Sequence, residues 1–327
     1  MGLFRRGPRR DGRDAPRDPA FSFFSVDEAA LFRGQVREAF AEHGLEVTLY
    51  ADAVTDSSGR RFPLGDLAAV CHNDDRGPRV WGDLARRHAG MVLRTLDGPS
   101  ALEALPPEQI RAQLYPRVIS EDGLDAQAFG YARSVAPGLY EVLALDLPES
   151  VMMLTDEALE PLGEVRALRE RALRNLRELP IEECETVTDR NIHGTRFEVV
   201  LGDSFYTASR VLALDTVVRK VTGEPIGPAG ALVALPFRHQ LAFHTIRDLT
   251  MVPSLNALAN FAATRYEDAP GAISPYVYWW RAGTLTQLSE SDDDGDGLRL
   301  VADDAFQDLL DHLARDTPPP DRPHHPD

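Results

Sequence analysis

The chain has 327 residues, a hydrophobic content of 43% and a net charge of −17 at pH 7. This length suffices for two modest domains or for one large domain with tails, and the composition is ordinary for a soluble globular protein. Such a negative charge repels a phosphate backbone, so we expect no nucleic-acid partner. No stretch approaches the roughly 18 apolar residues of a membrane helix. Because the first residues also lack the apolar core of a secretory signal, we expect a cytoplasmic protein with no membrane partner.

Both ends of the chain differ in composition from its middle. Residues 1–20 form an Arg-rich arm that mixes basic with acidic side chains and has almost nothing apolar to bury. We predict a disordered, solubilising arm; the alternative is an arm that touches an anionic surface or an acidic partner. Residues 317–327 are rich in proline and are predicted to be a disordered tail.

Residues 21–110 are expected to form a smaller N-terminal α/β region. Ser25 and Glu28 have the spacing of a capping box, which predicts the start of a helix. The other elements expected here are a strand at 45–49, a turn at 56–59, a strand at 60–62 and a helix at 80–93.

Residues 111–290 are expected to form the main domain, in which one pattern recurs. An amphipathic helix at 204–221 is followed by apolar strands, and a second helix with apolar residues from Leu255 to Ala262 is again followed by strands. The strands of these two units are expected at 231–235, 241–243, 276–280 and 284–288. Before them we expect strands at 117–120, 140–146, 150–154, 184–188 and 196–201, and a helix at 155–179. The pattern predicts an α+β fold whose helix–strand–strand units form mixed or antiparallel sheets.

Several segments resemble a known bacterial family. Asp203 followed by residues 206–212 (Tyr-Thr-Ala-Ser-Arg-Val-Leu) is similar to a conserved-looking element of the YtpQ-like proteins, and residues 175–180 and 230–236 are further similar pieces. The resemblance extends over about residues 26–288 and is specific between about 172 and 236. It implies a cytoplasmic α+β scaffold, and it supplies no catalytic residue.

The same element contains a candidate surface for a ligand or partner, formed by Asp203, Ser204 and Arg210. Asp203 and Ser204 stand at the predicted helix start, where a side-chain oxygen can cap a backbone N–H. Arg210 follows one or two turns later and could face an anion gathered there. The plainer interpretation, which we favour, is that Asp203 or Ser204 caps the helix and Arg210 pairs with a carboxylate of a neighbouring element.

Catalytic motifs are weak in this sequence. Gly202-Asp203-Ser204 invites comparison with the Gly-Asp-Ser esterases, but Ser204 lies two-thirds along the chain, and His312 has Leu309 rather than an aspartate three residues before it. His239 and His244 are five residues apart on strands, which is not the helical spacing of a zinc site. Cys71 and Cys184 are interpreted as reduced, buried thiols. We expect no cofactor.

A third motif stands near the C-terminal end, within a segment at 291–316 that is expected to contain an acidic turn, a strand and a final helix from 303 to about 315. Asp292, Asp294 and Asp296 have the spacing that opens an EF-hand calcium loop, with Asp303 at the twelfth position. A hairpin tip between strands 284–288 and 298–302 explains the same residues, and we favour it.

Function follows only indirectly from these features. The aromatic strand at 276–280 is expected to pack in the core or sheet, with a partner-binding face as the alternative. We expect a non-enzymatic protein-binding scaffold, chaperone-like or immunity-like, whose acidic surface meets a basic protein partner. The alternatives are a hydrolase whose groups converge from distant segments, and a calcium-binding protein.

Overall fold

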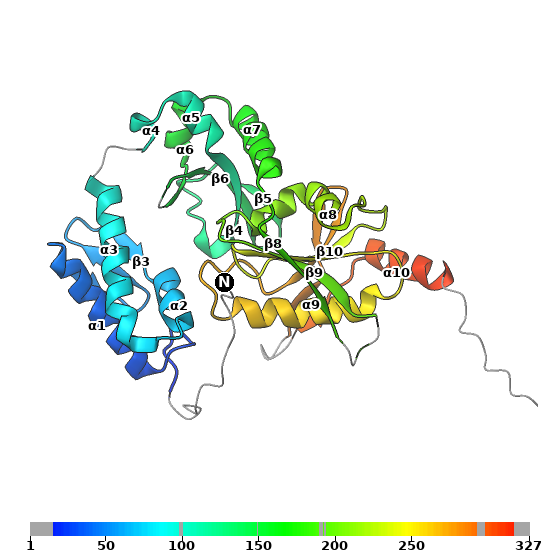
Figure 1. Ribbon diagram of the computed structural model, residues 1–327, viewed down its shortest axis with the longest axis horizontal. Coiled ribbons are helices and arrows are strands. Elements are labelled where there is room, and N and C mark those ends of the chain that lie inside the picture. Colours follow the sequence, from blue (N-terminus) through cyan, green and yellow to red (C-terminus); the bar gives the residue numbers. More distant parts are fainter. Residues whose placement is uncertain are drawn as a thin grey trace, which may run out of the picture. The chain divides into compact units, whose positions relative to one another are not determined.

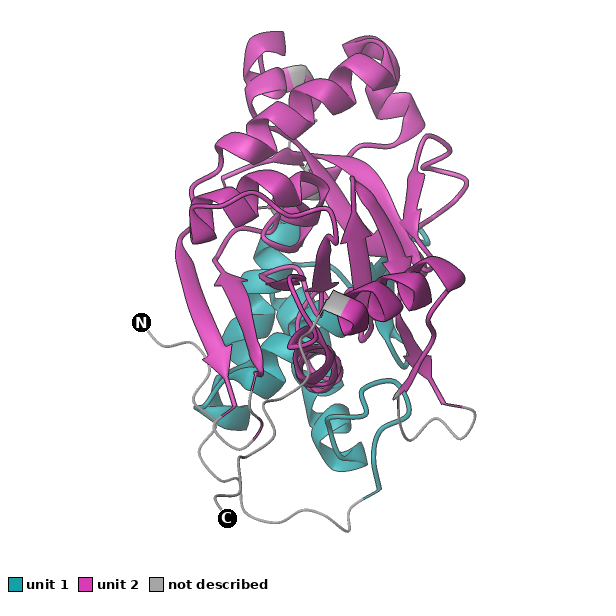
Figure 2. Cartoon of the chain, turned by 90° about the vertical axis from the view of Figure 1, so that its right-hand side faces the viewer, with its two compact units in different colours: residues 1–98 teal, residues 99–327 magenta. Residues whose placement is uncertain are grey.

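The computed structural model describes residues 16–97, 101–148, 150–189, 192, 194–292 and 298–316. The chain divides into two compact units, residues 1–98 and 99–327 (Figure 2). Among the described residues, no helix is both long enough and apolar enough to cross a membrane. The fold class is α+β, as predicted. The arm up to residue 15 and the tail from residue 317 lie outside the described residues, so their predicted disorder is untested.

Unit 1 combines helices with a small antiparallel sheet of order β1-β2-β3. Its elements are α1 (Val26–Glu42), β1 (Val47–Leu49), β2 (Ala53–Asp56), β3 (Arg61–Pro63), α2 (Gly65–Asn73), η1 (Gly77–Val80) and α3 (Trp81–Asp97). The capping box predicted for Ser25 and Glu28 is present at the start of α1. Strand β2 and helix α2 were not predicted, because β2 is too short to show alternation and the apolar face of α2 contains mostly small residues.

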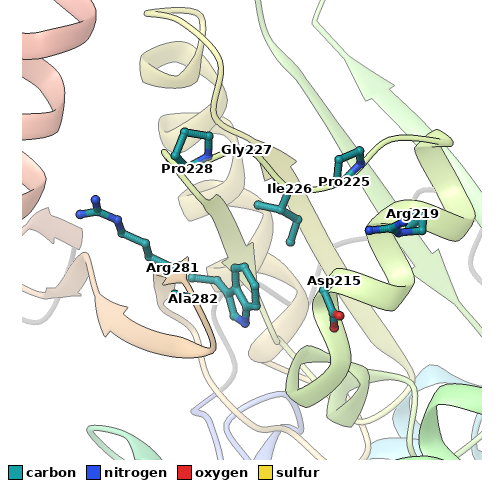
Figure 3. A pocket seen from close by; sticks show the side chains of 9 residues that line it. Asp215, Arg219, Pro225, Ile226, Gly227, Pro228, Arg281 and Ala282 are labelled. Carbon is teal, nitrogen blue, oxygen red and sulfur yellow. The ribbon is translucent and has the colours of Figure 1, made fainter.

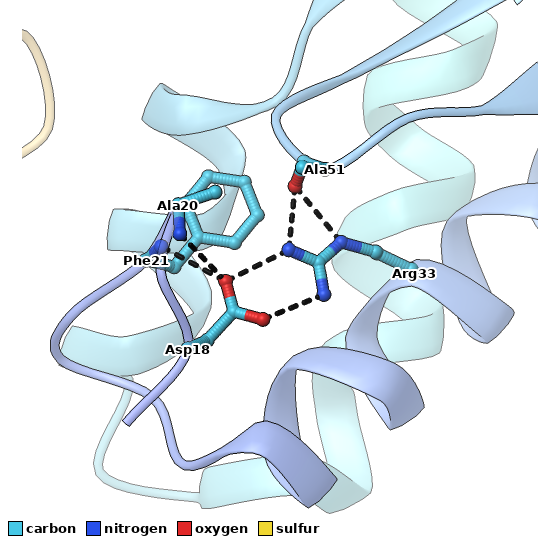
Figure 4. Close-up of polar contacts among 5 residues, drawn as sticks. All are labelled: Asp18, Ala20, Phe21, Arg33 and Ala51. Atoms are coloured by element: carbon cyan, nitrogen blue, oxygen red, sulfur yellow. Dashed lines mark hydrogen bonds and ion pairs between the residues drawn. The ribbon is translucent and has the colours of Figure 1, made fainter. Parts of the chain in front are cut away.

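The first residues of unit 1 are held by an ion pair (Figure 4). Both Asp18 oxygens accept from the Arg33 guanidinium, at 2.8 and 2.9 Å, and Arg33 also donates to the Ala51 carbonyl. The backbone N–H groups of Ala20 and Phe21 donate to Asp18 as well. Residues 16–20, which the predicted disordered arm included, are therefore fixed to α1. Around them lies an aromatic core that includes Phe21, Phe24, Phe32, Phe40 and Trp81.

Unit 2 begins with helices and a four-stranded antiparallel sheet. Its first elements are α4 (Ala101–Ala104), α5 (Pro107–Ala112), β4 (Leu114–Ser120), η2 (Glu121–Gly123), β5 (Arg133–Ala136), β6 (Leu139–Asp146), β7 (Val151–Met153), α6 (Asp156–Leu159), η3 (Glu160–Leu162) and α7 (Val165–Glu178). Strand β6 pairs with β4 on one side and with both β5 and β7 on the other. The helix predicted for 155–179 is divided into α6, η3 and α7. The break between η3 and α7 falls at Gly163, which adopts a φ of 118° that a continuing helix does not allow.

A six-stranded antiparallel sheet of order β13-β12-β10-β11-β9-β8 forms the centre of unit 2. Its strands are β8 (Glu183–Thr188), β9 (Arg196–Leu201), β10 (Ala231–Ala234), β11 (Gln240–Thr245), β12 (Val277–Arg281) and β13 (Thr284–Gln287). The helices between them are η4 (Ala208–Ala213), α8 (Leu214–Thr222) and α9 (Met251–Tyr266). The repeated helix–strand–strand units are thus present.

The helices of the two helix–strand–strand units cover opposite faces of this sheet (Figure 1). Ala231 and Val233 of β10 pack with η4, α8 and residues of the four-stranded sheet. Leu232 and Ala234 point the other way and pack with α9 and with α10 (Asp304–Asp316). Because both faces of the central strands are covered, these strands are apolar throughout rather than alternating.

Two predicted elements differ in the structure. The helix predicted from residue 204 begins only at Ala208 as a 3₁₀-helix and becomes α-helical at Leu214, because Ser209 and Arg210 make hydrogen bonds to other segments. The hairpin predicted between 284–288 and 298–302 instead joins β14 (Ser289–Ser291) to β15 (Leu298–Leu300), since β13 already pairs with β12.

Candidate functional site

Asp203 and Ser204 lie in the turn that leaves β9. The backbone N–H of Asp203 donates to the Glu182 carboxylate at 2.8 Å, and a Cβ on Gly202 would lie 3.1 Å from that carboxylate. The Ser204 hydroxyl accepts from the Tyr206 N–H at 3.2 Å, and the Ser204 carbonyl accepts from the Thr207 hydroxyl at 3.0 Å. These hydrogen bonds fix the turn and attach it to Glu182. Asp203 and Ser204 therefore have a structural role.

Arg210 is buried, with 3% of its surface exposed. It donates to the carbonyl oxygens of Leu179 at 3.1 Å and Pro180 at 2.5 Å, and burial lowers its pKa. Its partners are backbone carbonyls rather than the carboxylate that we expected. Arg210 therefore fastens η4 to the segment that joins α7 to β8, and it does not face the solvent beside Asp203 and Ser204.

His239 lies beside the turn that contains Ser204, since its ring contacts the Gly202 carbonyl at 3.1 Å. Its other ring nitrogen, Nε2, accepts from the Arg238 guanidinium at 3.0 Å, which places the ring proton on Nδ1. Burial lowers the pKa of His239, and the adjacent Arg238 charge lowers it further. A neutral imidazole with both nitrogens engaged is not arranged as the base that a serine nucleophile needs.

Metal ligands do not gather among the described residues, where no three His, Cys, Asp or Glu side chains are placed to hold an ion. His244 contacts the Arg196 carbonyl through Nδ1 at 2.6 Å. Asp303, the proposed twelfth calcium ligand, accepts from the Phe306 N–H at 2.8 Å and so caps α10. Asp292 is described, whereas Asp294 and Asp296 lie outside the described residues. The calcium loop is therefore untested.

The aromatic strand packs mainly inside unit 2. Tyr278 and Trp279 are buried on opposite faces of the sheet, and the Trp279 indole N–H donates to the Ala229 carbonyl at 2.8 Å. Tyr276 and Trp280 are half-buried against the same core as Tyr278. Core packing thus accounts for most of this strand.

A surface hollow of about 330 Å³ lies next to Trp280. It is lined by Asp215 and Arg219 of α8, by the loop 225–228, and by Arg281 and Ala282 at the β12–β13 turn (Figure 3). Figure 3 shows Arg281 on the opposite side of the hollow from Asp215 and Arg219, and the Arg281 guanidinium lies over the Trp279 ring. The charged groups do not converge, so the hollow gives no arrangement for acid–base chemistry.

Two polar residues that the sequence analysis did not single out, Tyr115 of β4 and Asp146 of β6, lie near Tyr206. Tyr206 stacks on Tyr115 with ring centroids 4.7 Å apart, and its buried hydroxyl has no hydrogen-bond partner among the described residues. Burial raises the pKa of Tyr206, and the Asp146 carboxylate raises it further. These residues come from distant parts of the sequence, so no local motif could have indicated them.

Strand β8 is exposed along most of its length and lies at the end of the six-stranded sheet. Glu183, Cys184, Glu185, Thr186 and Thr188 are all exposed, and Val187 is half-buried. Thr186 donates to Glu198 at 2.6 Å, and Glu198 also accepts from Arg196. Glu183 and Glu185 make no ion pair with any described residue, so they leave two unneutralised carboxylates on this strand.

The glutamates on and beside β8 affect the pKa of Cys184, which lies on this strand. Cys184 is a free, exposed thiol, whose pKa is raised by partial burial and by the Glu198 and Glu185 carboxylates. The sequence contained a signal for this site, since residues 183–188 include two glutamates and two threonines, and Val187 is their one aliphatic residue. Such a pattern is typical of an edge strand.

No protein-family model matches this chain, and no curated protein and no solved structure matches it.

Proposed function

We propose that this chain is a non-enzymatic protein-binding protein of the cytoplasm, chaperone-like or immunity-like, whose acidic surface meets a basic partner. The observation that carries the proposal is the exposed strand β8 with its unneutralised Glu183 and Glu185. Carboxylates that have no ion-pair partner among the described residues can meet cations of another protein. A protein with a net charge of −17 also attracts basic partners at long range and accelerates their encounter.

The three residues predicted from the sequence as a surface for a ligand or partner support this proposal through their structural role. Asp203, Ser204 and Arg210 each bind backbone groups of neighbouring segments. They hold the connection from α7 to β8 and the turn after β9 in place, and so they support the strand that we propose as the binding surface. Membership of the YtpQ-like family, which implies a similar scaffold, is part of the same proposal.

The alternative functions have less support. A hydrolase would need a base for Ser204, and the nearby His239 has both ring nitrogens engaged. A calcium-binding function would require that added calcium raise the melting temperature, because an ion bound only by the folded state must stabilise it. Asp303, one of the four proposed ligands, already caps α10.

The proposed function is tested by affinity capture from the native host with the full-length chain. We expect a basic protein that is retained at low salt and released as salt is raised, because screening weakens contacts between exposed charges. Glu183→Lys together with Glu185→Lys should reduce capture. The matched control, Asp308→Lys with Asp311→Lys on the exposed side of α10, makes the same charge change elsewhere. Capture of no basic protein, or capture indifferent to salt, would contradict the proposal.

A further inference from the structure

Strand β8 has an open outer edge. It pairs with β9 along all of its residues, from Glu183 opposite Leu201 to Thr188 opposite Arg196. In an antiparallel ladder about half of the backbone N–H and C=O groups of an end strand point away from its neighbour. No described strand pairs with β8 on that outer side. These groups are therefore free to pair with an additional strand.

Two other sheet edges of unit 2 are contacted by segments of the same chain. In the four-stranded sheet, β4 is an end strand, and the N–H of its residue Val118 donates to the Ser209 hydroxyl of η4 at 2.9 Å. At the far end of the six-stranded sheet, β13 packs beside β5. These two edges are thus contacted by the chain's own residues, whereas no described strand pairs with the outer edge of β8.

The side chains of β8 indicate the chemistry of a strand that would fit there. Glu183 and Glu185 share one face of the sheet, since they lie opposite Leu201 and Val199. Cys184, Thr186 and Thr188 share the other face. An added strand places alternate side chains on alternate faces, so lysine or arginine at every second position would stand opposite the two glutamates.

The same charges disfavour a second copy of β8 as the added strand. Two acidic strands side by side would place like charges directly across from one another, which destabilises the pairing. Acidic side chains on an open edge are a common protection against such self-association. A basic strand meets no such repulsion.

We infer that the outer edge of β8 binds an extended basic segment of a partner protein, which adds to the six-stranded sheet as a further strand. This inference rests on the proposed function and specifies its binding surface. Main-chain hydrogen bonds provide attachment, and the Glu183 and Glu185 carboxylates select alternating cations.

The inference is tested with a synthetic peptide that alternates lysine with valine, added to the full-length protein. We expect it to bind, and a peptide that alternates glutamate with valine not to bind.

Two further versions of the lysine–valine peptide carry N-methyl groups on every second amide, in the two opposite phases. A strand added at an edge uses only every second N–H, so one phase should abolish binding and the other should preserve it. Glu183→Lys with Glu185→Lys should weaken binding about tenfold, because two attractive cross-strand pairs become repulsive, and the α10 control pair should leave it unchanged.

Several results would overturn the inference. Equal binding of both N-methylated peptides would show attraction by charge without strand addition. Tighter peptide binding after substitution of Arg5, Arg6, Arg9 and Arg10 by glutamine would show that the chain's own arm occupies the edge. Dimers disrupted by the β8 substitutions would identify a second copy as the occupant. If a basic host partner is captured equally by wild type and by the β8 variant, the proposed function stands and the edge assignment fails.

Discussion

The Ser209 hydroxyl accepts a hydrogen bond from the backbone N–H of Val118 at 2.9 Å, in the buried layer between the six-stranded and four-stranded sheets of unit 2. This bond joins η4 to β4 and satisfies a group that no strand reaches on that side. It explains in part why residues 208–213 form a 3₁₀-helix rather than the predicted α-helix, since Ser209 must face β4.

Replacement of Ser209 by alanine should therefore destabilise unit 2. The Val118 N–H would lose its acceptor in a buried place, which costs about 1–3 kcal/mol. Urea denaturation of Ser209→Ala measures the loss. The matched substitution at the exposed Ser57, whose hydroxyl makes no hydrogen bond with a described residue, should change the free energy of unfolding by less than about 0.5 kcal/mol. Equal stability of Ser209→Ala and wild type would contradict the role of this bond.

The pair Asp18–Arg33 should make the stability of unit 1 depend on pH. Hydrogen bonds from Arg33 hold the pKa of Asp18 below its ordinary value, against the opposing effect of burial. Since the folded pKa is lowered, the stabilisation is fully present above the unfolded pKa and disappears as pH falls through the folded pKa, a window below about pH 4. Asp18→Asn should lower the melting temperature at neutral pH and flatten its decline in acid. The exposed Asp75→Asn should retain the wild-type profile; a steep acid decline in Asp18→Asn would point to another carboxylate.

The two thiols should differ in reactivity. Cys184 is exposed on β8, whereas Cys71 is buried and its pKa is raised to about 12, mainly by burial. Alkylation of the native protein should modify Cys184 first. Glu185→Gln should lower the Cys184 pKa and accelerate its reaction about two-fold, because thiolate is the reactive form. Glu157→Gln is the control, on an exposed residue of α6. Modification of Cys71 as fast as Cys184 would contradict the difference in exposure between the two thiols.

The turn between β12 and β13 contains a strained alanine. Ala282 has φ 48° and Gly283 has φ 86°, which together fit the two-residue hairpin turn that favours asparagine or glycine at its first position. Ala282→Asn should raise the free energy of unfolding by about 0.5–1 kcal/mol. The same substitution at Ala305, on the exposed first turn of α10, should lower it, because asparagine is a poorer helix former than alanine. A loss of stability in Ala282→Asn would exclude strain at this position.

Periodicity in the sequence predicted most of the individual elements. Strands β9, β10 and β12, helix α9 and helix α10 lie close to their predicted positions, because a buried face repeats at the spacing of its secondary structure. Elements without a regular face were missed, as α2 shows. The order of the strands could not be predicted, since β10 and β12 lie side by side although α9 separates them in the chain.

The candidate site, like the order of the strands, could be predicted from the sequence only in part. Asp203 and Ser204 were recognised as turn or capping residues, and they do fix a turn. Arg210 was expected to pair with a carboxylate, but the structure supplies the carbonyls of Leu179 and Pro180, which come from a segment some thirty residues away. Glu185 was part of the strand predicted at 184–188, and Glu183 lies one residue before it. Their significance depends on β8 being the last strand of its sheet, and that position is set by tertiary pairing alone.

The most direct measurement is hydrogen exchange of the β8 amides in the full-length protein, alone and with the captured basic partner. In the free protein the outward-facing amides of residues 183–188 should exchange quickly, because no strand in the described part of the chain pairs with them. In the complex, exchange in this strand should slow strongly. Unchanged exchange in β8 together with protection elsewhere on the chain would contradict the account.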